Sequence, residues 1–226
     1  MISRITSRIF LGEFSDVVDS NGGNPRLRSE ALDSFGINCI LNIMEDGNGV
    51  VVEGRLMLSQ LKYSYVWSPV PVDCAGCADY ANSAVCDDCL KKPGLKNSKF
   101  IKGLDQACTK LSHILSRDGE NVLVHCIAGM DRSPFVVAKY LSDKVKIVPK
   151  LSTDKSKALD FIDVGSMSKA YAFIKLSRPF ICEHLEWIWW EDGETKKKNY
   201  KRMFHKLLDE DLKMNKPHHP RDVAKR

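Results

Sequence analysis

A cysteine and an arginine separated by five residues, Cys126 and Arg132, have the clearest chemical potential in this chain. The apolar run at residues 122–124 is rich in β-branched residues and predicts a buried strand before them. A second apolar run predicts a packed helix over residues 135–141, with Ser133 near its N-cap. A loop between a strand and a helix N-terminus directs several backbone N–H groups at one anion. It also favours the thiolate form of a cysteine, and a neighbouring arginine can hold two oxygens of a phosphate. The spacing therefore predicts a nucleophile inside a phosphate-binding loop.

The wider pattern, His125-Cys126-x-x-Gly129-x-x-Arg132-Ser133, resembles the signature of the cysteine-dependent protein tyrosine phosphatases, and the surrounding chain resembles their dual-specificity branch. The resemblance implies an α/β fold with a central, mostly parallel sheet flanked by helices and with the Cys-x5-Arg loop between a strand and a helix. It also implies that Cys126 is the nucleophile, that His125 orients it, and that Ser133 donates to the thiolate and helps it leave. The residues implied to bind phosphate are Ile127, Ala128, Gly129, Met130, Asp131 and Arg132.

A general acid is expected upstream of this loop. Residues 63–72 are rich in β-forming residues and predict another strand, which Asp73 follows directly. In the family that the chain resembles, the general acid is an aspartate on the loop after this strand, and Asp73 matches that place. A carboxylic acid there would give a proton to the leaving oxygen and then, as a carboxylate, take one from water. Asp79, Asp87 and Asp88 are competing candidates, and the simplest alternative is that Asp73 caps a turn.

Four cysteines directly after Asp73 form two Cys-x-x-Cys pairs separated by eight residues. Tetrahedral zinc is commonly held by four thiolates, and a site without an open coordination position is structural. The predicted zinc ligands are Cys74, Cys77, Cys86 and Cys89. Four free thiols on a flexible loop, or redox-active disulfides, are the alternatives. The stretch at residues 74–97 departs from the family pattern, so we interpret it as an insertion.

The remaining patterns indicate strands and helices around this loop. Short apolar runs predict strands at residues 9–12 and 37–44. Apolar residues at helical spacing, with capping signals, predict helices at residues 26–35, 98–116, 166–177 and from 183 to about 190. Cys108 falls on the apolar stripe of the second helix, which indicates a core residue. A Lys- and Asp-rich stretch at residues 142–165 is predicted to be an extended surface loop and a second insertion.

The 226 residues suffice for one domain with additions, and we place the catalytic domain at residues 1–192. The net charge of +5 is uneven, because residues 195–226 hold eleven Lys or Arg against four Asp or Glu. Residues 193–226 therefore form a basic extension, and their apolar residues follow helical spacing. We expect this amphipathic extension to dock on its own domain, or to contact a protein, an anionic membrane or nucleic acid.

No secretory signal is expected, because the first eleven residues hold Arg4 and Arg8 and no continuous apolar region. No apolar run approaches the length of a transmembrane helix. We therefore expect an intracellular protein, cytoplasmic or nuclear. The eight cysteines are not expected to form a disulfide framework in such a compartment.

The sequence as a whole predicts a phosphoprotein phosphatase that hydrolyses phosphotyrosine and phosphoserine or phosphothreonine through a phosphocysteine intermediate, without a catalytic cofactor. The variable loop positions hold no basic residue and one acidic residue, Asp131. This favours a phosphoprotein over a polyanion such as an RNA 5′-triphosphate, a phosphoinositide or a glycan phosphate. A phosphate-binding module without turnover is the second hypothesis, which the cysteine-rich insertion beside the acid leaves open. A buried structural cysteine followed by a chance arginine is the simplest alternative.

Overall fold

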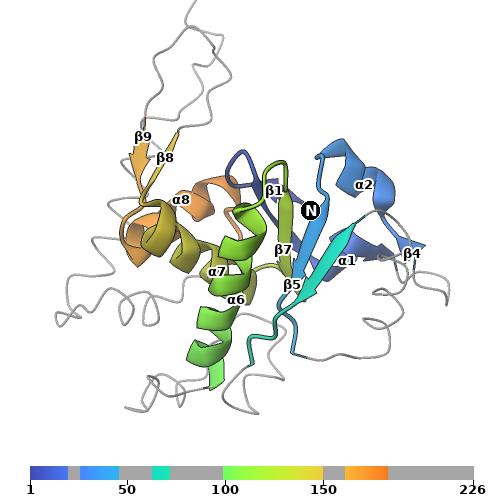
Figure 1. Ribbon diagram of the computed structural model, residues 1–226, viewed down its shortest axis with the longest axis horizontal. Coiled ribbons are helices and arrows are strands. Elements are labelled where there is room, and N and C mark those ends of the chain that lie inside the picture. The colour runs from blue at the N-terminus through green and yellow to red at the C-terminus, as the bar shows by residue number, and fades with distance from the viewer. Residues whose placement is uncertain (20–25, 46–62, 72–98, 150–160, 183–226) are drawn as a thin grey trace, which may run out of the picture.

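The computed structural model describes residues 1–19, 26–45, 63–71, 99–149 and 161–182 of the chain. Its centre is a five-stranded sheet with the strand order β1-β2-β7-β5-β6 (Figure 1). In that order the strands are Ser3–Arg4, Ile9–Glu13, Val122–Cys126, Cys39–Asn42 and Ser64–Trp67. Strand β1 is antiparallel to β2, and the other three neighbouring pairs are parallel. The predicted α/β fold with a mostly parallel sheet is therefore confirmed.

The sheet buries both of its faces, since successive side chains of a strand point to opposite sides. Val124 and Leu41 belong to the larger of two hydrophobic clusters. Leu123 and Ile40, their neighbours in the chain, belong to the smaller one. All five residues of β7 are buried, as the continuous apolar run at residues 122–124 predicts for a central parallel strand.

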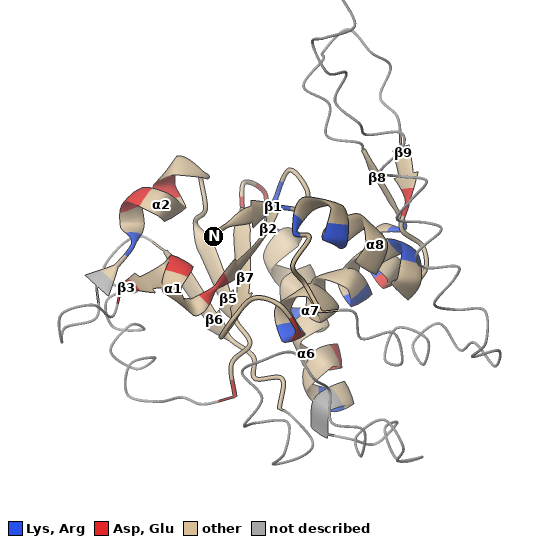
Figure 2. Ribbon diagram, turned by 180° about the vertical axis from the view of Figure 1, so that it is seen from behind, with Lys and Arg blue, Asp and Glu red and all other residues tan. Residues whose placement is uncertain are grey.

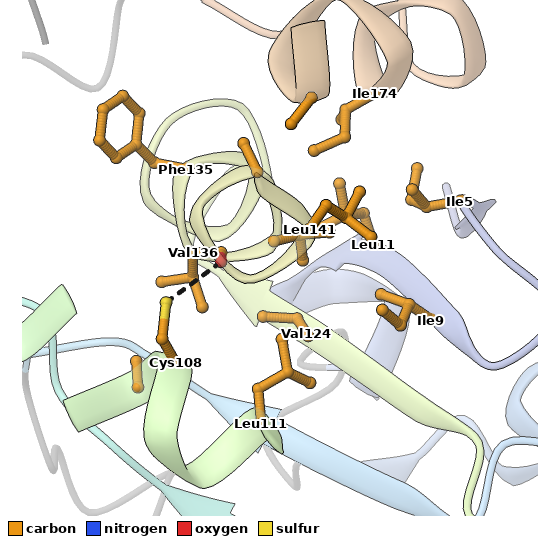
Figure 3. Packing of buried hydrophobic residues seen from close by; sticks show 14 of the residues in the cluster. Ile5, Ile9, Leu11, Cys108, Leu111, Val124, Phe135, Val136, Leu141 and Ile174 are labelled. Carbon is orange, nitrogen blue, oxygen red and sulfur yellow. Dashed lines mark hydrogen bonds between the residues drawn. The ribbon is translucent and has the colours of Figure 1, made fainter. Parts of the chain in front are cut away.

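Helices cover both faces of the sheet (Figure 1). The larger cluster is completed by α6 (Lys99–Leu115), α7 (Arg132–Tyr140) and α8 (Met167–Ser177), and Figure 3 shows part of it. The smaller cluster is completed by α1 (Phe14–Val17) and α2 (Ser29–Ser34). Acidic residues gather on α1 and α2, whereas α8 carries basic residues (Figure 2). The loop after β7 thus leads into a helix that is packed on the larger cluster.

Two predicted helices are confirmed almost to the residue. Helix α6 spans all but the end residues of the stretch predicted at 98–116. Helix α8 begins after Ser166, whose side chain accepts a hydrogen bond from the Lys169 N–H at 3.3 Å, as an N-cap does. Cys108 is buried as predicted, and its thiol donates to the Val136 carbonyl at 3.4 Å (Figure 3).

The helix predicted over residues 26–35 is wrong at its start. Its first two residues form strand β4 (Arg26–Leu27), which pairs antiparallel with β3 (Val18–Asp19), and α2 begins only at Ser29. The Arg28 N–H donates to the Val17 carbonyl at 2.9 Å, which continues this pairing. Pairing with strand β3 has thus overridden the local helical spacing.

The surface loop predicted at residues 142–165 is also partly wrong. Helix α7 continues through a π-helical turn, Leu141–Val145. Strand β8 (Ile147–Pro149) then pairs antiparallel with β9 (Phe161–Asp163). Val148 is buried and joins the larger cluster, so this hairpin is packed against the domain.

Several predicted features lie outside the described residues. They are the insertion at residues 74–97, the helix expected from residue 183 and the basic extension at residues 193–226. Within the described parts of the chain, no helix combines the length and the apolar composition that crossing a bilayer requires.

The segment that leads from β6 toward Asp73 is held against helix α6. Strand β6 ends at Trp67, earlier than predicted, because prolines at positions 69 and 71 supply no N–H for a ladder. The Val70 N–H instead donates to the Ile43 carbonyl at 3.1 Å. A Cβ atom on Gly103 of α6 would lie 2.7 Å from Cδ of Pro71. Only glycine permits this approach of helix and segment.

We expect Gly103→Ala to lower the free energy of unfolding by about 1–3 kcal/mol, because the added methyl overlaps the proline segment. In an unobstructed helix interior the same change would raise the free energy of unfolding by about 1 kcal/mol. The sign of the change therefore shows whether Gly103 is in close contact with the proline segment. Urea denaturation measures the difference. Lys102→Ala, at an exposed neighbour on α6, is the control and should change stability by less than about 0.5 kcal/mol. A Gly103→Ala protein more stable than wild type would contradict the contact.

Candidate active site: the loop between strand β7 and helix α7

The register of the sheet brings the carboxyl ends of three parallel strands to one edge. Cys126, the last residue of β7, pairs with Glu13, the last residue of β2. His125 pairs with Asn42, the last residue of β5. Ligands of open α/β sheets bind outside the carboxyl ends of the strands. The loop at residues 127–131 leaves the sheet at this edge.

The structure brings three of the predicted residues together at the Cys126 sulfur. Cys126 is 3% exposed. The Gly129 N–H donates to its Sγ atom at 3.2 Å, and Oγ of Ser133 lies 3.4 Å from the same atom. One backbone N–H and one hydroxyl thus contact the same sulfur. The Cys126 sulfur therefore has polar contacts and is not packed only among apolar groups.

Helix α7 begins at Arg132, and the N-cap position is occupied by Asp131. The prediction that Ser133 lies near the N-cap is thus displaced by two residues. Ser133 is inside the first turn and completely buried. Its hydroxyl contacts the Cys126 sulfur and does not cap the helix. The guanidinium of Arg132 is half-buried and donates to the Val70 carbonyl at 3.4 Å. Arg132 therefore contacts the segment that leads to Asp73.

Gly129 turns the loop back toward the sulfur. Its φ angle is +64°, in the left-handed region that favours glycine. A Cβ atom there would overlap the carbonyl oxygen of Gly12 and a guanidinium nitrogen of Arg178. The loop thus requires glycine at this position for two reasons, the backbone angle and the close approach of β2.

The other loop residues make an apolar rim with one acid. Ile127 is 59% exposed, and Ala128 and Met130 are half-buried. The Met130 carbonyl accepts from the Cys182 N–H at 3.0 Å. Burial and the Asp131 carboxylate, to which the thiol donates, raise the pKa of Cys182 to about 12. Asp131 thus faces Cys182, and the loop carries no cation other than Arg132.

His125 lies on the face of β7 opposite to Cys126. Its ring is 1% exposed and packs beside Phe14, with 6.3 Å between the ring centroids. Its Nδ1 atom is 3.3 Å from the carbonyl oxygen of Cys126. Burial lowers the pKa of His125 to about 4, so the ring is neutral at physiological pH. The structure therefore places His125 against the backbone of Cys126, and its orienting role stays a prediction.

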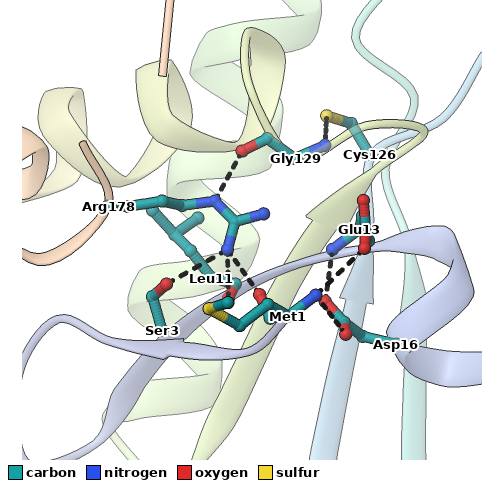
Figure 4. Close-up of polar contacts among 8 residues, drawn as sticks. All are labelled: Met1, Ser3, Leu11, Glu13, Asp16, Cys126, Gly129 and Arg178. Atoms are coloured by element: carbon teal, nitrogen blue, oxygen red, sulfur yellow. Dashed lines mark hydrogen bonds and ion pairs between the residues drawn. The ribbon is translucent and has the colours of Figure 1, made fainter. Parts of the chain in front are cut away.

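Arg178 is a residue of this site that sequence reasoning missed. The sequence indicates Arg178-Pro179 as the end of helix α8, a pair that resembles the Arg-Pro found there in dual-specificity phosphatases, but it predicts no contact with the loop. In the structure it is completely buried, and its Nε donates to the Gly129 carbonyl at 2.9 Å (Figure 4). The signal that could have found it is an arginine placed between the apolar face of α8 and the apolar residues Phe180 and Ile181.

Asp73 and the four predicted zinc ligands lie outside the described residues, so their roles stay predictions. Pro71, two residues before Asp73, is the last described residue of that segment. Among the described residues, no three His, Cys, Asp or Glu side chains are grouped so that they could hold a metal ion.

No protein-family model matches the chain, and no curated protein matches it. Several solved structures do. A mouse putative dual specificity phosphatase complexed with zinc tungstate is 17% identical with a TM-score of 0.49, over 90% of this chain and 91% of that one. Human DUSP28 is 16% identical with a TM-score of 0.44, over 92% and 93%. The human tyrosine phosphatase-like serine/threonine/tyrosine-interacting protein is 15% identical with a TM-score of 0.46, over 94% and 96%. Such values concern the backbone alone, so the reaction has to be inferred from the residues of the loop.

We expect acid to destabilise the fold through His125. Because burial lowers its pKa from 6.5 to about 4, only the unfolded chain takes up a proton at His125 between these values. The neutral ring's contribution is fully present above pH 6.5 and is lost as the pH falls toward 4. As the pH falls from 6.5 to 4, the free energy of unfolding of wild type should therefore decrease relative to that of His125→Asn, by up to about 3 kcal/mol.

Urea denaturation at several pH values measures this difference. His113→Asn removes an exposed histidine of helix α6 and is the control for the loss of one histidine. A difference for His125→Asn that stays constant with pH would show that His125 titrates alike in the folded and unfolded protein.

Proposed function

We propose that this chain is a phosphoprotein phosphatase that hydrolyses phosphotyrosine and phosphoserine or phosphothreonine monoesters through a phosphocysteine. The observation that carries the proposal is the convergence of donors on one sulfur. The Sγ atom of Cys126 receives the Gly129 N–H at 3.2 Å and lies 3.4 Å from Oγ of Ser133, at the N-terminus of helix α7. A structural cysteine in a core has no need of such donors.

In the first step the Cys126 thiolate attacks phosphorus. A sulfur–phosphorus bond forms, and the bond between phosphorus and the substrate oxygen breaks. Backbone N–H groups of residues 127–132 and the guanidinium of Arg132 stabilise the charge on the phosphoryl oxygens. Asp73 gives the proton that the leaving oxygen needs.

In the second step water attacks the phosphocysteine. The Asp73 carboxylate takes a proton from the water, inorganic phosphate is released and the sulfur leaves as a thiolate. Ser133 donates to this thiolate from 3.4 Å, which makes it a better leaving group. The same two donors that hold the nucleophile before the first step therefore assist its departure in the second.

The route of the chain supports Asp73 as the acid. The Val70 carbonyl lies 3.4 Å from a guanidinium nitrogen of Arg132, and Gly103 holds Pro71 against helix α6. Two further residues span at most about 7 Å, so the Cα of Asp73 is within that distance of the Cα of Pro71. An aspartate on this short tether can reach a phosphate held by Arg132.

The surroundings of the loop favour a phosphoprotein over a polyanion. The exposed loop residue is the apolar Ile127, and the only charged variable position is Asp131. Glu13 lies at the same edge of the sheet, beside Cys126 in the register. A substrate with several phosphates would require additional cations here.

Kinetics test the proposal. We expect Cys126→Ser to abolish hydrolysis of p-nitrophenyl phosphate, because a serine hydroxyl is not ionised at neutral pH. Asp73→Ala should lower kcat by about 10²–10⁴-fold, most for substrates with poor leaving groups, which need the proton. Phosphotyrosine and phosphothreonine peptides measure the preference between the two ester types.

Cys108→Ser is the matched control, since that thiol is buried in the core and donates to the Val136 carbonyl of helix α7. It should retain turnover. Appreciable activity of Cys126→Ser would refute the phosphocysteine. Wild-type protein that binds phosphate but does not turn over would instead support a phosphate-binding module.

We also propose a structural zinc at Cys74, Cys77, Cys86 and Cys89, supported by their spacing. Purified untagged protein should contain about one equivalent of zinc by elemental analysis. The double variant Cys77→Ser/Cys86→Ser should lose it, whereas Cys108→Ser should keep it. A wild-type protein free of zinc would refute the site and leave the phosphatase proposal standing.

A further inference from the structure

We propose that Arg178 is a positioning residue for the phosphate-binding loop, which fixes the backbone at Gly129 and supplies a buried positive charge near the Cys126 sulfur. This inference deepens the proposed function and rests on it only in treating Cys126 as the nucleophile. Arg178 itself is not expected to touch the substrate.

The guanidinium of Arg178 connects the end of helix α8 with two distant segments, the loop at Gly129 and the N-terminal residues 1–3 (Figure 4). Its Nε donates to the Gly129 carbonyl at 2.9 Å. Its Nη1 donates to the Met1 carbonyl at 2.6 Å and to Oγ of Ser3 at 3.1 Å. Arg178 is completely buried, so these hydrogen bonds are shielded from water and have a fixed geometry.

Gly129 transmits this contact to the nucleophile. Its carbonyl accepts from Arg178, while its own N–H donates to the Cys126 sulfur at 3.2 Å. The two groups belong to successive peptide planes that meet at the Gly129 Cα, where φ is +64°. Holding one plane therefore restricts the orientation of the other. Without the guanidinium, the N–H is free to turn away from the sulfur.

The charge of Arg178 acts on the same sulfur. Burial lowers its pKa, whereas the Asp16 and Glu13 carboxylates and the Cys126 sulfur raise it. An arginine remains cationic in spite of burial. The two carboxylates also pair with the Met1 ammonium, at 2.5 Å for Asp16 and 3.0 Å for Glu13. The guanidinium charge thus acts on the Cys126 sulfur as well as on the two carboxylates.

Phe180 covers the guanidinium. Its ring centroid lies 4.3 Å from the Arg178 Cζ atom, and the outer side of the ring is exposed. The Nη2 atom has no hydrogen-bond partner among the described residues and lies against Gly129. A cation excluded from water and incompletely hydrogen-bonded exerts a stronger field than a solvated one.

A purely structural role would also cost stability when Arg178 is replaced, so stability alone cannot decide. The deciding readout is the pH dependence of Cys126 alkylation by iodoacetamide, which reports the thiolate directly. Trypsin releases residues 118–132 as one peptide, and Cys126 is its only cysteine. Mass spectrometry of that peptide follows Cys126 without interference from the other thiols.

Arg8 offers a matched control. It donates to the carbonyls of Glu120, Leu115 and Arg117, at the end of β7 away from Cys126. Arg8→Met thus removes a comparable set of side-chain-to-carbonyl hydrogen bonds from the same strand's surroundings. It leaves the phosphate-binding loop untouched.

We expect Arg178→Met to move the midpoint of the alkylation profile upward by about one pH unit, because a nearby positive charge is lost. Arg178→Lys keeps the charge and should restore more than half of the shift. Arg8→Met should leave the midpoint unchanged. If Arg178→Met does not fold, Phe180→Ala is the second variant. It admits water to the guanidinium and should move the midpoint in the same direction by a smaller amount.

A midpoint that stays at the wild-type value in Arg178→Met, or in Phe180→Ala where that variant replaces it, would overturn the inference. An equal shift in Arg8→Met would overturn it too, because the effect would then be general loosening. The alkylation result does not depend on turnover. A wild-type protein without phosphatase activity would therefore refute the proposed function, while the midpoint would still decide the role of Arg178.

Discussion

Cys126 is the last residue of a strand that has a parallel neighbour on each side. The pairing of β7 with β2 and β5 is continuous up to Glu13 and Asn42, so the position and direction of the Cys126 Cα are fixed by two ladders at once. The chain must leave the sheet directly after this residue, because helix α7 begins six positions later. A loop this short between two fixed elements has few conformations, and the site depends on that restriction.

The loop satisfies its backbone through partners from distant parts of the chain. The Gly129 N–H points inward, to the Cys126 sulfur. The carbonyls of the loop then point outward and would be buried without partners. Phe14, Cys182 and Arg178 donate to the carbonyls of Ile127, Met130 and Gly129, respectively. Three carbonyls on the outer surface of the loop thus each have a defined hydrogen-bond donor.

Two arginines donate hydrogen bonds to backbone carbonyls at opposite ends of β7. Arg8 donates to carbonyls of the turn that leads into the strand, and Arg178 to a carbonyl of the loop that leads out of it. A planar guanidinium with five donors can satisfy several irregular carbonyls that no helix or strand reaches. At the outgoing end the same geometry also brings a positive charge near the Cys126 sulfur, and the role that we propose for Arg178 rests on this difference from Arg8.

Local chemistry in the sequence determined the fold class and most of the candidate site. The apolar run at residues 122–124 predicted the central strand, and the spacing of Cys126, Gly129, Arg132 and Ser133 predicted a loop whose donors converge, since those residues lie close together in the chain. Strand pairings and contacts with other parts of the chain could not be obtained this way. Arg26 and Leu27 became a strand because Val18 and Asp19 lie beside them, and residues 147–149 because residues 161–163 do. Arg178 lies 49 residues from Gly129 and 177 from Met1 in the chain, and only the packing of α8 against α7 brings its guanidinium beneath the loop. Sequence spacing thus specified the face of the loop that would meet a ligand, and the tertiary structure alone specified what holds that face in place.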